Sequence, residues 1–147
     1  MANQKIKNLL IQLLKEGQQA RVPAYGISMY PLLRPGDQLL VEPTKPEIGD
    51  IAVFDRGDVL VAHRVYKIRQ DNYFLKGDSL IHADTPVHIN HILGVVIARY
   101  RKNKCMAHNN ISFRLFKLII PRCTFTLGRP LYYYARLHQK LIAKRKH

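Results

Sequence analysis

Apolar residues near the start of the chain recur at helical spacing and predict an amphipathic helix over residues 3–16, ending near Gly17. They occupy positions i, i+3, i+4, i+7 and i+8, namely Ile6, Leu9, Leu10, Leu13 and Leu14. The other positions are polar but not richly basic, with Lys7 among them. We therefore expect the apolar face to pack on the protein itself or on a partner protein, in preference to a membrane surface.

From Val22 onward the pattern changes to short extended runs separated by turns, which predicts an antiparallel β domain. The expected strands cover residues 38–42, 50–55, 59–68, 73–76 and 92–101. Turn sequences at 35–37, 56–58 and 70–72 separate the runs, so residues 50–68 form one predicted hairpin. The spacing of the turns is equally compatible with a small barrel.

Beyond residue 104 the apolar positions return to helical spacing, with tyrosines, arginines and lysines between them. Pro121 and Pro130 interrupt this pattern and favour two basic, aromatic-containing helical segments. We therefore divide the chain into an N-terminal amphipathic helix (1–21), a β domain (22–104) and a basic helical C-terminal extension (105–147).

The net charge of +14 is concentrated in the last third of the chain. Residues 1–98 contain 11 Lys/Arg and all 10 Asp/Glu, whereas residues 99–147 contain 13 Lys/Arg and no acidic residue. Such a segment attracts anionic lipids, nucleic acids or acidic proteins. Peripheral membrane contact through residues 105–147 and a helical hairpin with its charges in water are equally compatible with this pattern, while nucleic acid is the less favoured partner.

No window approaches the ~18–20 consecutive apolar residues of a spanning helix, and residues 1–21 lack an apolar signal core. We therefore expect a cytoplasmic or peripherally membrane-associated protein. Cys105 and Cys123 show no metal-ligand spacing, and two reduced thiols are favoured over a disulfide. The spacing of His82, His88 and His91 matches no familiar ligand pattern, so we expect neither a metal nor another cofactor.

Two residues suggest nucleophilic catalysis. Ser28 lies in the segment Gly-Ile-Ser-Met-Tyr-Pro (26–31), and His63 follows one predicted hairpin later. A serine hydroxyl is a poor nucleophile at neutral pH, but a histidine with a pKa near ~6.5 can accept its proton. The pair therefore predicts a hydrolase.

Four sequence boxes in this order resemble the signal peptidase family of serine peptidases (S24/S26 type), in the branch of archaea and the endoplasmic reticulum that uses histidine as the base. The boxes are residues 26–31, 49–54, 63–65 and 76–78, the last followed by Asp84 and Gly94. The resemblance covers roughly residues 22–100. It implies a coiled antiparallel β fold, shared with LexA-like self-cleaving repressors, which have a lysine where this chain has His63.

The resemblance implies the following roles. Ser28 is the nucleophile and its amide an oxyanion donor, while His63 is the general base. Asp84 is favoured over Asp78 as the acid that orients His63, and Asp78 is expected to accept from turn amides or from a cation such as Arg64. Lys67 lies too far along the strand to replace His63.

The resemblance also predicts the surroundings of the nucleophile. Gly26 is expected to allow a sharp bend, and it stands where many relatives carry a serine that donates to the oxyanion. Met29 and Pro31 are expected to shape the groove. Asp37 and Asp50 are read as turn-stabilising residues.

The expected activity is that of a serine endopeptidase that cleaves a leader or signal segment from a precursor peptide. The substrate would lie extended along a strand edge, with shallow apolar pockets for small side chains. The alternative is a non-catalytic module that binds a peptide, a membrane or nucleic acid through the same fold and the cationic tail. A self-cleaving repressor is less favoured, because it would use a lysine base and the 21 residues before the first box cannot form a DNA-binding domain.

Overall fold

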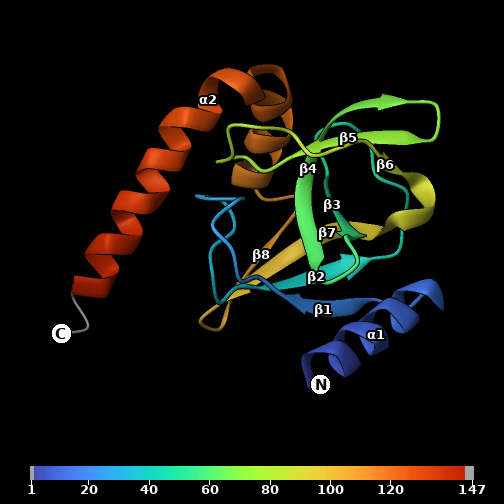
Figure 1. Ribbon diagram of the computed structural model, residues 1–147. Coiled ribbons are helices and arrows are strands. Elements are labelled where there is room, and N and C mark those ends of the chain that lie inside the picture. The colour runs from blue at the N-terminus through green and yellow to red at the C-terminus, as the bar shows by residue number, and fades with distance from the viewer. Residues whose placement is uncertain (1, 145–147) are drawn as a thin grey trace.

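The computed structural model describes residues 2–144 (Figure 1). Within this range, helix α1 (Ala2–Lys15) precedes eight strands and a short 3-10 turn, and helix α2 (Ile111–Lys144) follows them. The strands are β1 (Ala20–Pro23), β2 (Gln38–Glu42), β3 (Ile51–Asp55), β4 (Leu60–Arg69), β5 (Asn72–Lys76), β6 (Val87–His88), β7 (Ile92–Arg101) and β8 (Lys104–Ala107).

All neighbouring strands are antiparallel and form one sheet in the order β1-β2-β7-β3-β4-β5-β6, with β8 paired to the end of β7. This half-barrel confirms the mainly β fold class. The five expected strands are present, each within one residue of its predicted bounds. The sequence did not reveal β1, β6 and β8, which have only two to four residues each and therefore show little alternation.

Helix α1 covers one end of the sheet next to β1 (Figure 1), and Leu10, Leu13 and Leu14 of its predicted apolar face pack on the core. Leu14 is buried in the larger core, whereas Ile6 and Leu9 are 55% and 56% exposed. Lys7 is instead buried, because its ammonium lies 2.7 Å from Asp55 and donates to the carbonyl of Gly57. The hairpin supplies polar partners there, so the first turns of the helix bury a lysine and leave two of the five predicted apolar residues exposed.

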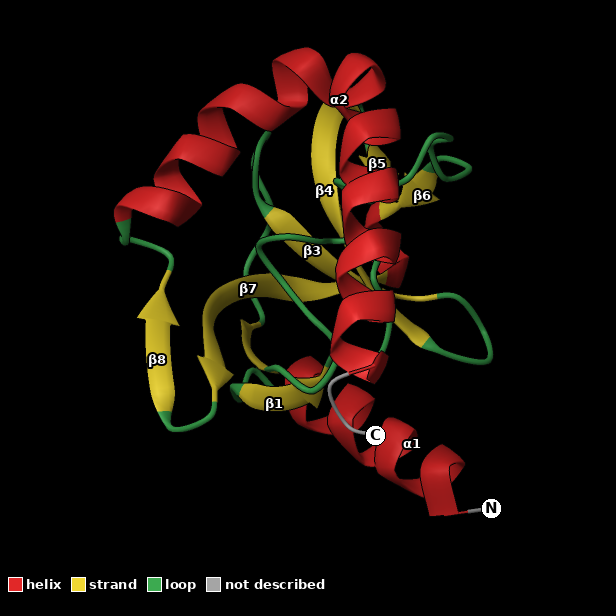
Figure 2. Ribbon diagram, turned by 90° about the vertical axis from the view of Figure 1, so that its left-hand side faces the viewer, coloured by secondary structure: helices red, strands yellow, loops and turns green. Residues whose placement is uncertain are grey.

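Helix α2 consists of two arms that meet at a kink, as Figures 1 and 2 show. Cys123 has non-helical dihedral angles, two residues after Pro121, so we call residues 111–122 the first arm and 124–144 the second arm. The first arm contains the buried residues Phe113 and Ile120. On the second arm Tyr134 packs on Tyr30, with ring centroids 5.7 Å apart. The expected basic helical C-terminal extension is confirmed.

The two helices mark opposite ends of the molecule. The kink of α2 lies at the end opposite α1 in Figure 1 and again in Figure 2.

Cys105 is exposed and Cys123 half-buried, and both are free thiols. None of the helices within residues 2–144 combines the length and apolar character needed to cross a bilayer.

Candidate active site

Residues 77–79 contact and support the loop that carries Ser28. The backbone N–H of Ser79 donates to the Ser28 carbonyl at 2.9 Å, and the Ser79 hydroxyl donates to the Ile27 carbonyl at 2.5 Å. Gly77 passes so close that a Cβ there would lie 2.7 Å from the carbonyl oxygen of Ser28. Ser79 is fully buried, whereas Ser28 itself is half-buried. The main chain at Ser28 is therefore fixed while its side chain faces accessible space.

His63 lies in the middle of β4, opposite Ala52 of β3, and is 3% exposed. Its Nδ1 lies 2.5 Å from Oδ2 of Asp84, a carboxylate that is itself almost buried. The other carboxylate oxygen accepts from the guanidinium of Arg56. Since a carboxylate accepts hydrogen bonds, Nδ1 carries the proton of the neutral imidazole and Nε2 remains free to accept one.

Ser28 and His63 line the same cavity, which has a volume of about 380 Å³. Gly26, Met29 and Leu80 contribute to the same wall. The residues that the structure describes contain no hydrogen bond between the Ser28 hydroxyl and His63. A serine hydroxyl turns about a single bond, and catalytic hydrogen bonds commonly tighten only when substrate binds. The cavity thus holds a candidate nucleophile beside a candidate base whose Nδ1 contacts a carboxylate.

The amino-acid sequence of the chain was compared with known proteins. Residues 4–97, more than half of the chain, match the sequence model of the family described as Peptidase S24-like. The chain belongs to the Peptidase S24-like family. This family includes serine peptidases. Comparison with curated proteins gave no significant match.

The S24-like segment contains Ser28, His63 and Asp84 and ends within β7, so α2 lies outside it. Among the described residues that line the cavity there is no lysine. The register between β4 and β5 shifts between Val65 and Lys67. The regular alternation of side chains along β4 is therefore interrupted between His63 and Lys67. The ammonium of Lys67 lies over the Phe74 ring, 5.2 Å from its centroid.

Lys76 is the other lysine near the nucleophile loop, and its surroundings are structural. It is 1% exposed, and its Nζ donates to the carbonyls of Thr124, at 2.6 Å, and of Gly77, at 3.3 Å. Burial lowers the pKa of Lys76, and attraction to Asp78 opposes this effect. Lys76 therefore fixes the kink of α2 to the end of β5.

Asp78 forms a buried ion pair with Arg64, the residue after His63. The guanidinium donates to both carboxylate oxygens, at 2.8 and 2.7 Å, and also to the Gly49 carbonyl at 2.8 Å. Asp78 lies outside the lining of the cavity. Its carboxylate joins the loop at 77–79 to β4, which keeps Ser79 and His63 in a fixed relation.

Two expectations about the nucleophile loop need correction. Gly26 does not have a positive φ, and a Cβ there would meet only the Ser28 nitrogen, at 3.9 Å, so the bend does not require glycine. Pro31, which follows Tyr30 in a cis peptide bond, does not line the cavity, whereas Met29 does.

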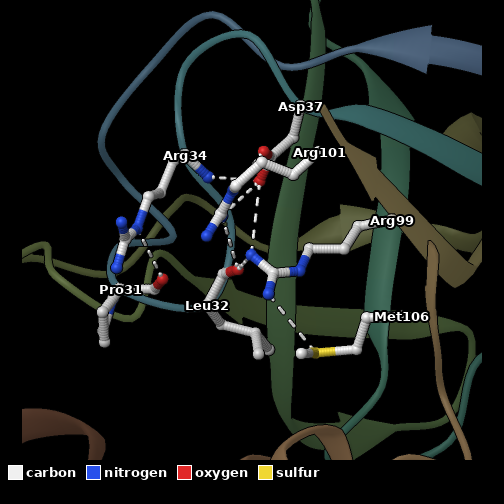
Figure 3. A network of polar contacts seen from close by, with 7 residues as sticks. All are labelled: Pro31, Leu32, Arg34, Asp37, Arg99, Arg101 and Met106. Atoms are coloured by element: carbon white, nitrogen blue, oxygen red, sulfur yellow. Dashed lines mark hydrogen bonds and ion pairs between the residues drawn. The ribbon is translucent and has the colours of Figure 1, made fainter. Parts of the chain in front are cut away.

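Figure 3 shows a network behind the loop that sequence reasoning did not find. Asp37 accepts from the Arg34 N–H at 2.8 Å, as expected for a turn residue, and both its oxygens also accept from Arg101, at 2.7 Å each. Arg99 donates to the Leu32 carbonyl at 2.8 Å. These two arginines, counted above in the cationic tail, thus belong to the support of residues 31–37.

Asp50 accepts from the N–H of Glu47, at 2.9 Å, as expected for a turn residue.

Two residues that the sequence did not single out also belong to the site. Arg56 was expected only as part of a turn, but it pairs with Asp84 and lines the cavity. Ser79 was not predicted either, because no local pattern in the sequence indicates its hydrogen bonds to the carbonyls of Ile27 and Ser28.

Proposed function

We propose that this S24-like protein is a serine endopeptidase in which Ser28 is the nucleophile, His63 the general base and Asp84 the acid that orients His63. The observation that carries the proposal is that Ser28 and His63 line one cavity. The carboxylate of Asp84 contacts Nδ1 of His63, which leaves Nε2 available to the serine. A buried acid on Nδ1 favours the tautomer whose Nε2 accepts a proton.

The reaction follows from this arrangement. The Ser28 oxygen attacks the scissile carbonyl carbon while Nε2 of His63 takes the hydroxyl proton, and the proton then passes to the leaving amine as the C–N bond breaks. A water molecule next attacks the acyl-enzyme and gives a proton to Nε2, which returns it to Ser28 as the ester bond breaks. The N–H of Ser28, which donates no hydrogen bond within the described residues, supplies one oxyanion donor.

The substrate would be an extended peptide that adds to exposed strand edges. Residues 60–63 of β4 pair with β3 on one side only, because β5 begins its pairing at Arg64. Strand β1 pairs with β2 alone. Both edges contribute to the cavity, through Val22, Pro23 and residues 60–63. A peptide between them gains main-chain hydrogen bonds, and the apolar wall favours small apolar side chains before the cut.

Such a groove suits a flexible leader or signal segment of a precursor peptide, in line with the resemblance to the histidine-type signal peptidases. The test compares the purified protein with Ser28→Ala and, as a matched control, Ser112→Ala, on synthetic precursors that contain an Ala-x-Ala site. We expect cleavage by the wild type and by Ser112→Ala, and a loss of at least about 1,000-fold for Ser28→Ala. Mass spectrometry identifies the cut.

The alternative function is a peptide-binding module without catalysis, which the lack of a direct Ser28–His63 hydrogen bond in the described residues favours. That function predicts that wild type and Ser28→Ala bind the same peptides with equal affinity and that neither cleaves them. Equal cleavage by both proteins would assign the activity to a contaminant or to another residue.

A further inference from the structure

The outward face of the first arm of α2 is apolar, although it does not contact the sheet. Four aliphatic side chains on this face are about half exposed or more: Ile111, Leu115, Leu118 and Ile119. Phe113 and Ile120, on the opposite face, are buried and account for the packing of the arm. The arm therefore has two apolar faces, and its own domain covers only one of them.

A cavity of about 430 Å³ opens beside this face, between the first arm and the sheet. Arg114, Arg122 and Lys117 contribute cations to its wall, and Leu118 contributes an apolar side chain. Lys117 is neutralised by Asp50, at 2.8 Å, and by Glu47, at 3.5 Å. Neither arginine has a carboxylate partner among the described residues. Two cations thus remain available for an anionic group next to an apolar surface.

The same combination continues on the second arm. Tyr133, Leu137 and Leu141 are more than half exposed, and Arg136 and Lys140 lie between them in the sequence. No acidic residue occurs between residues 99 and 147. An extended surface of one charge sign with aliphatic and tyrosine side chains is complementary to an anionic lipid interface.

We propose that α2 docks the protein on the surface of an anionic bilayer. The aliphatic side chains of the first arm enter the interface, and Arg114 and Arg122 bind lipid phosphates at the mouth of the cavity. A nucleic acid would neutralise the arginines but leave the apolar face of the first arm in water, because base stacking needs aromatic partners and the four exposed apolar side chains of that face are aliphatic. The proposal does not depend on catalysis, so Ser28→Ala should bind vesicles as the wild type does.

The first experiment measures co-sedimentation of the full chain with vesicles of phosphatidylcholine alone or with one third phosphatidylglycerol. We expect binding to the anionic vesicles only. Arg114→Gln/Arg122→Gln should weaken it by about tenfold or more, and Leu115→Ser/Leu118→Ser should weaken it by a similar factor. The control Lys15→Gln/Lys45→Gln removes the same charge from exposed positions outside α2 and should change binding less than about threefold. Thermal melts check that each variant folds.

The second experiment uses the absence of tryptophan from the sequence. Leu118→Trp provides one fluorophore on the proposed face, and Lys45→Trp provides one on an exposed loop. We expect a blue shift and quenching by brominated lipid for the first variant only. The proposal is overturned by no binding to anionic vesicles, by equal losses in the arginine and lysine double variants, or by a single-stranded or duplex DNA that displaces the vesicles.

Discussion

Nδ1 of His63 lies 2.5 Å from Oδ2 of Asp84, although 21 residues separate them in the chain. The backbone N–H of Asp84 donates to the carbonyl of Leu75 at 2.9 Å, which fixes the loop against β5. The guanidinium of Arg56 occupies the remaining carboxylate oxygen. With both oxygens and the main chain held, the carboxylate determines the orientation of the imidazole.

Replacing Asp84 by asparagine should therefore abolish most of the proposed activity. An asparagine amide can donate to Nδ1 and thereby favour the tautomer whose Nε2 already carries a proton, which a general base cannot use. A comparable triad loses about 10⁴ in kcat from this change. The measurement is steady-state cleavage of the precursor peptide. Asp71→Asn, an exposed acid in a distant turn, is the control. Retention of a tenth of the activity by Asp84→Asn would contradict the assignment.

Ser79 offers a second prediction, because its hydroxyl is the side-chain partner of the Ile27 carbonyl. Ser79→Ala removes one of two hydrogen bonds to that carbonyl, which still accepts from the N–H of Tyr30 at 3.0 Å, and should reduce the free energy of unfolding by about 0.5–1.5 kcal/mol. A displaced Ser28 should also lower kcat more than it raises KM. Urea unfolding and peptide cleavage are the two measurements. A change confined to KM would mean that Ser79 does not position the nucleophile.

The sequence allowed the strands and the catalytic candidates to be predicted, for a physical reason. β2 and β7 alternate or stay apolar over five and ten residues, so local pattern alone defines them. The boxes around Ser28 and His63 are also local. None of these signals extends over more than the ten consecutive residues of β7.

The supporting contacts could not be predicted in this way, because they join residues far apart in the chain. Arg56 meets Asp84 across 28 residues, and Arg101 meets Asp37 across 64. No local pattern encodes such pairs. The burial of Lys7 in α1 was missed for a related reason, since periodicity identifies a helix but not the ion-pair partner that Asp55 offers to Lys7.

The Lys7–Asp55 ion pair predicts how stability depends on pH. Burial alone would raise the pKa of Asp55, but the hydrogen bonds from Lys7 and Gly57 and the attraction to Lys7 outweigh it, so the pKa lies below its usual value of 3.8. The contribution of this pair to folding is therefore complete above about pH 4 and is lost as the pH falls further. The stability difference between wild type and Lys7→Gln should shrink when urea unfolding is repeated from pH 6 to pH 3.

Lys5→Gln, an exposed lysine on the same helix, is the control for the loss of charge and should give a small difference at every pH. The difference for Lys7→Gln should not vanish at pH 3, because Lys7 also donates to the Gly57 carbonyl. A difference that stays constant from pH 6 to pH 3 would show that Asp55 does not carry the interaction.

The open space at Gly26 leads to the last prediction. A Cβ there would lie 3.9 Å from the Ser28 nitrogen and meet no other group within 4 Å, and the φ angle suits any residue. A hydroxyl on that carbon would thus stand beside the N–H that is proposed to bind the oxyanion. Gly26→Ser should raise kcat, by up to about 100-fold for one added donor, with little change in KM. Gly26→Ala adds the same carbon without a donor and should give no gain. Equal rates for the two variants would place the oxyanion away from residue 26 and would require a different donor geometry around Ser28.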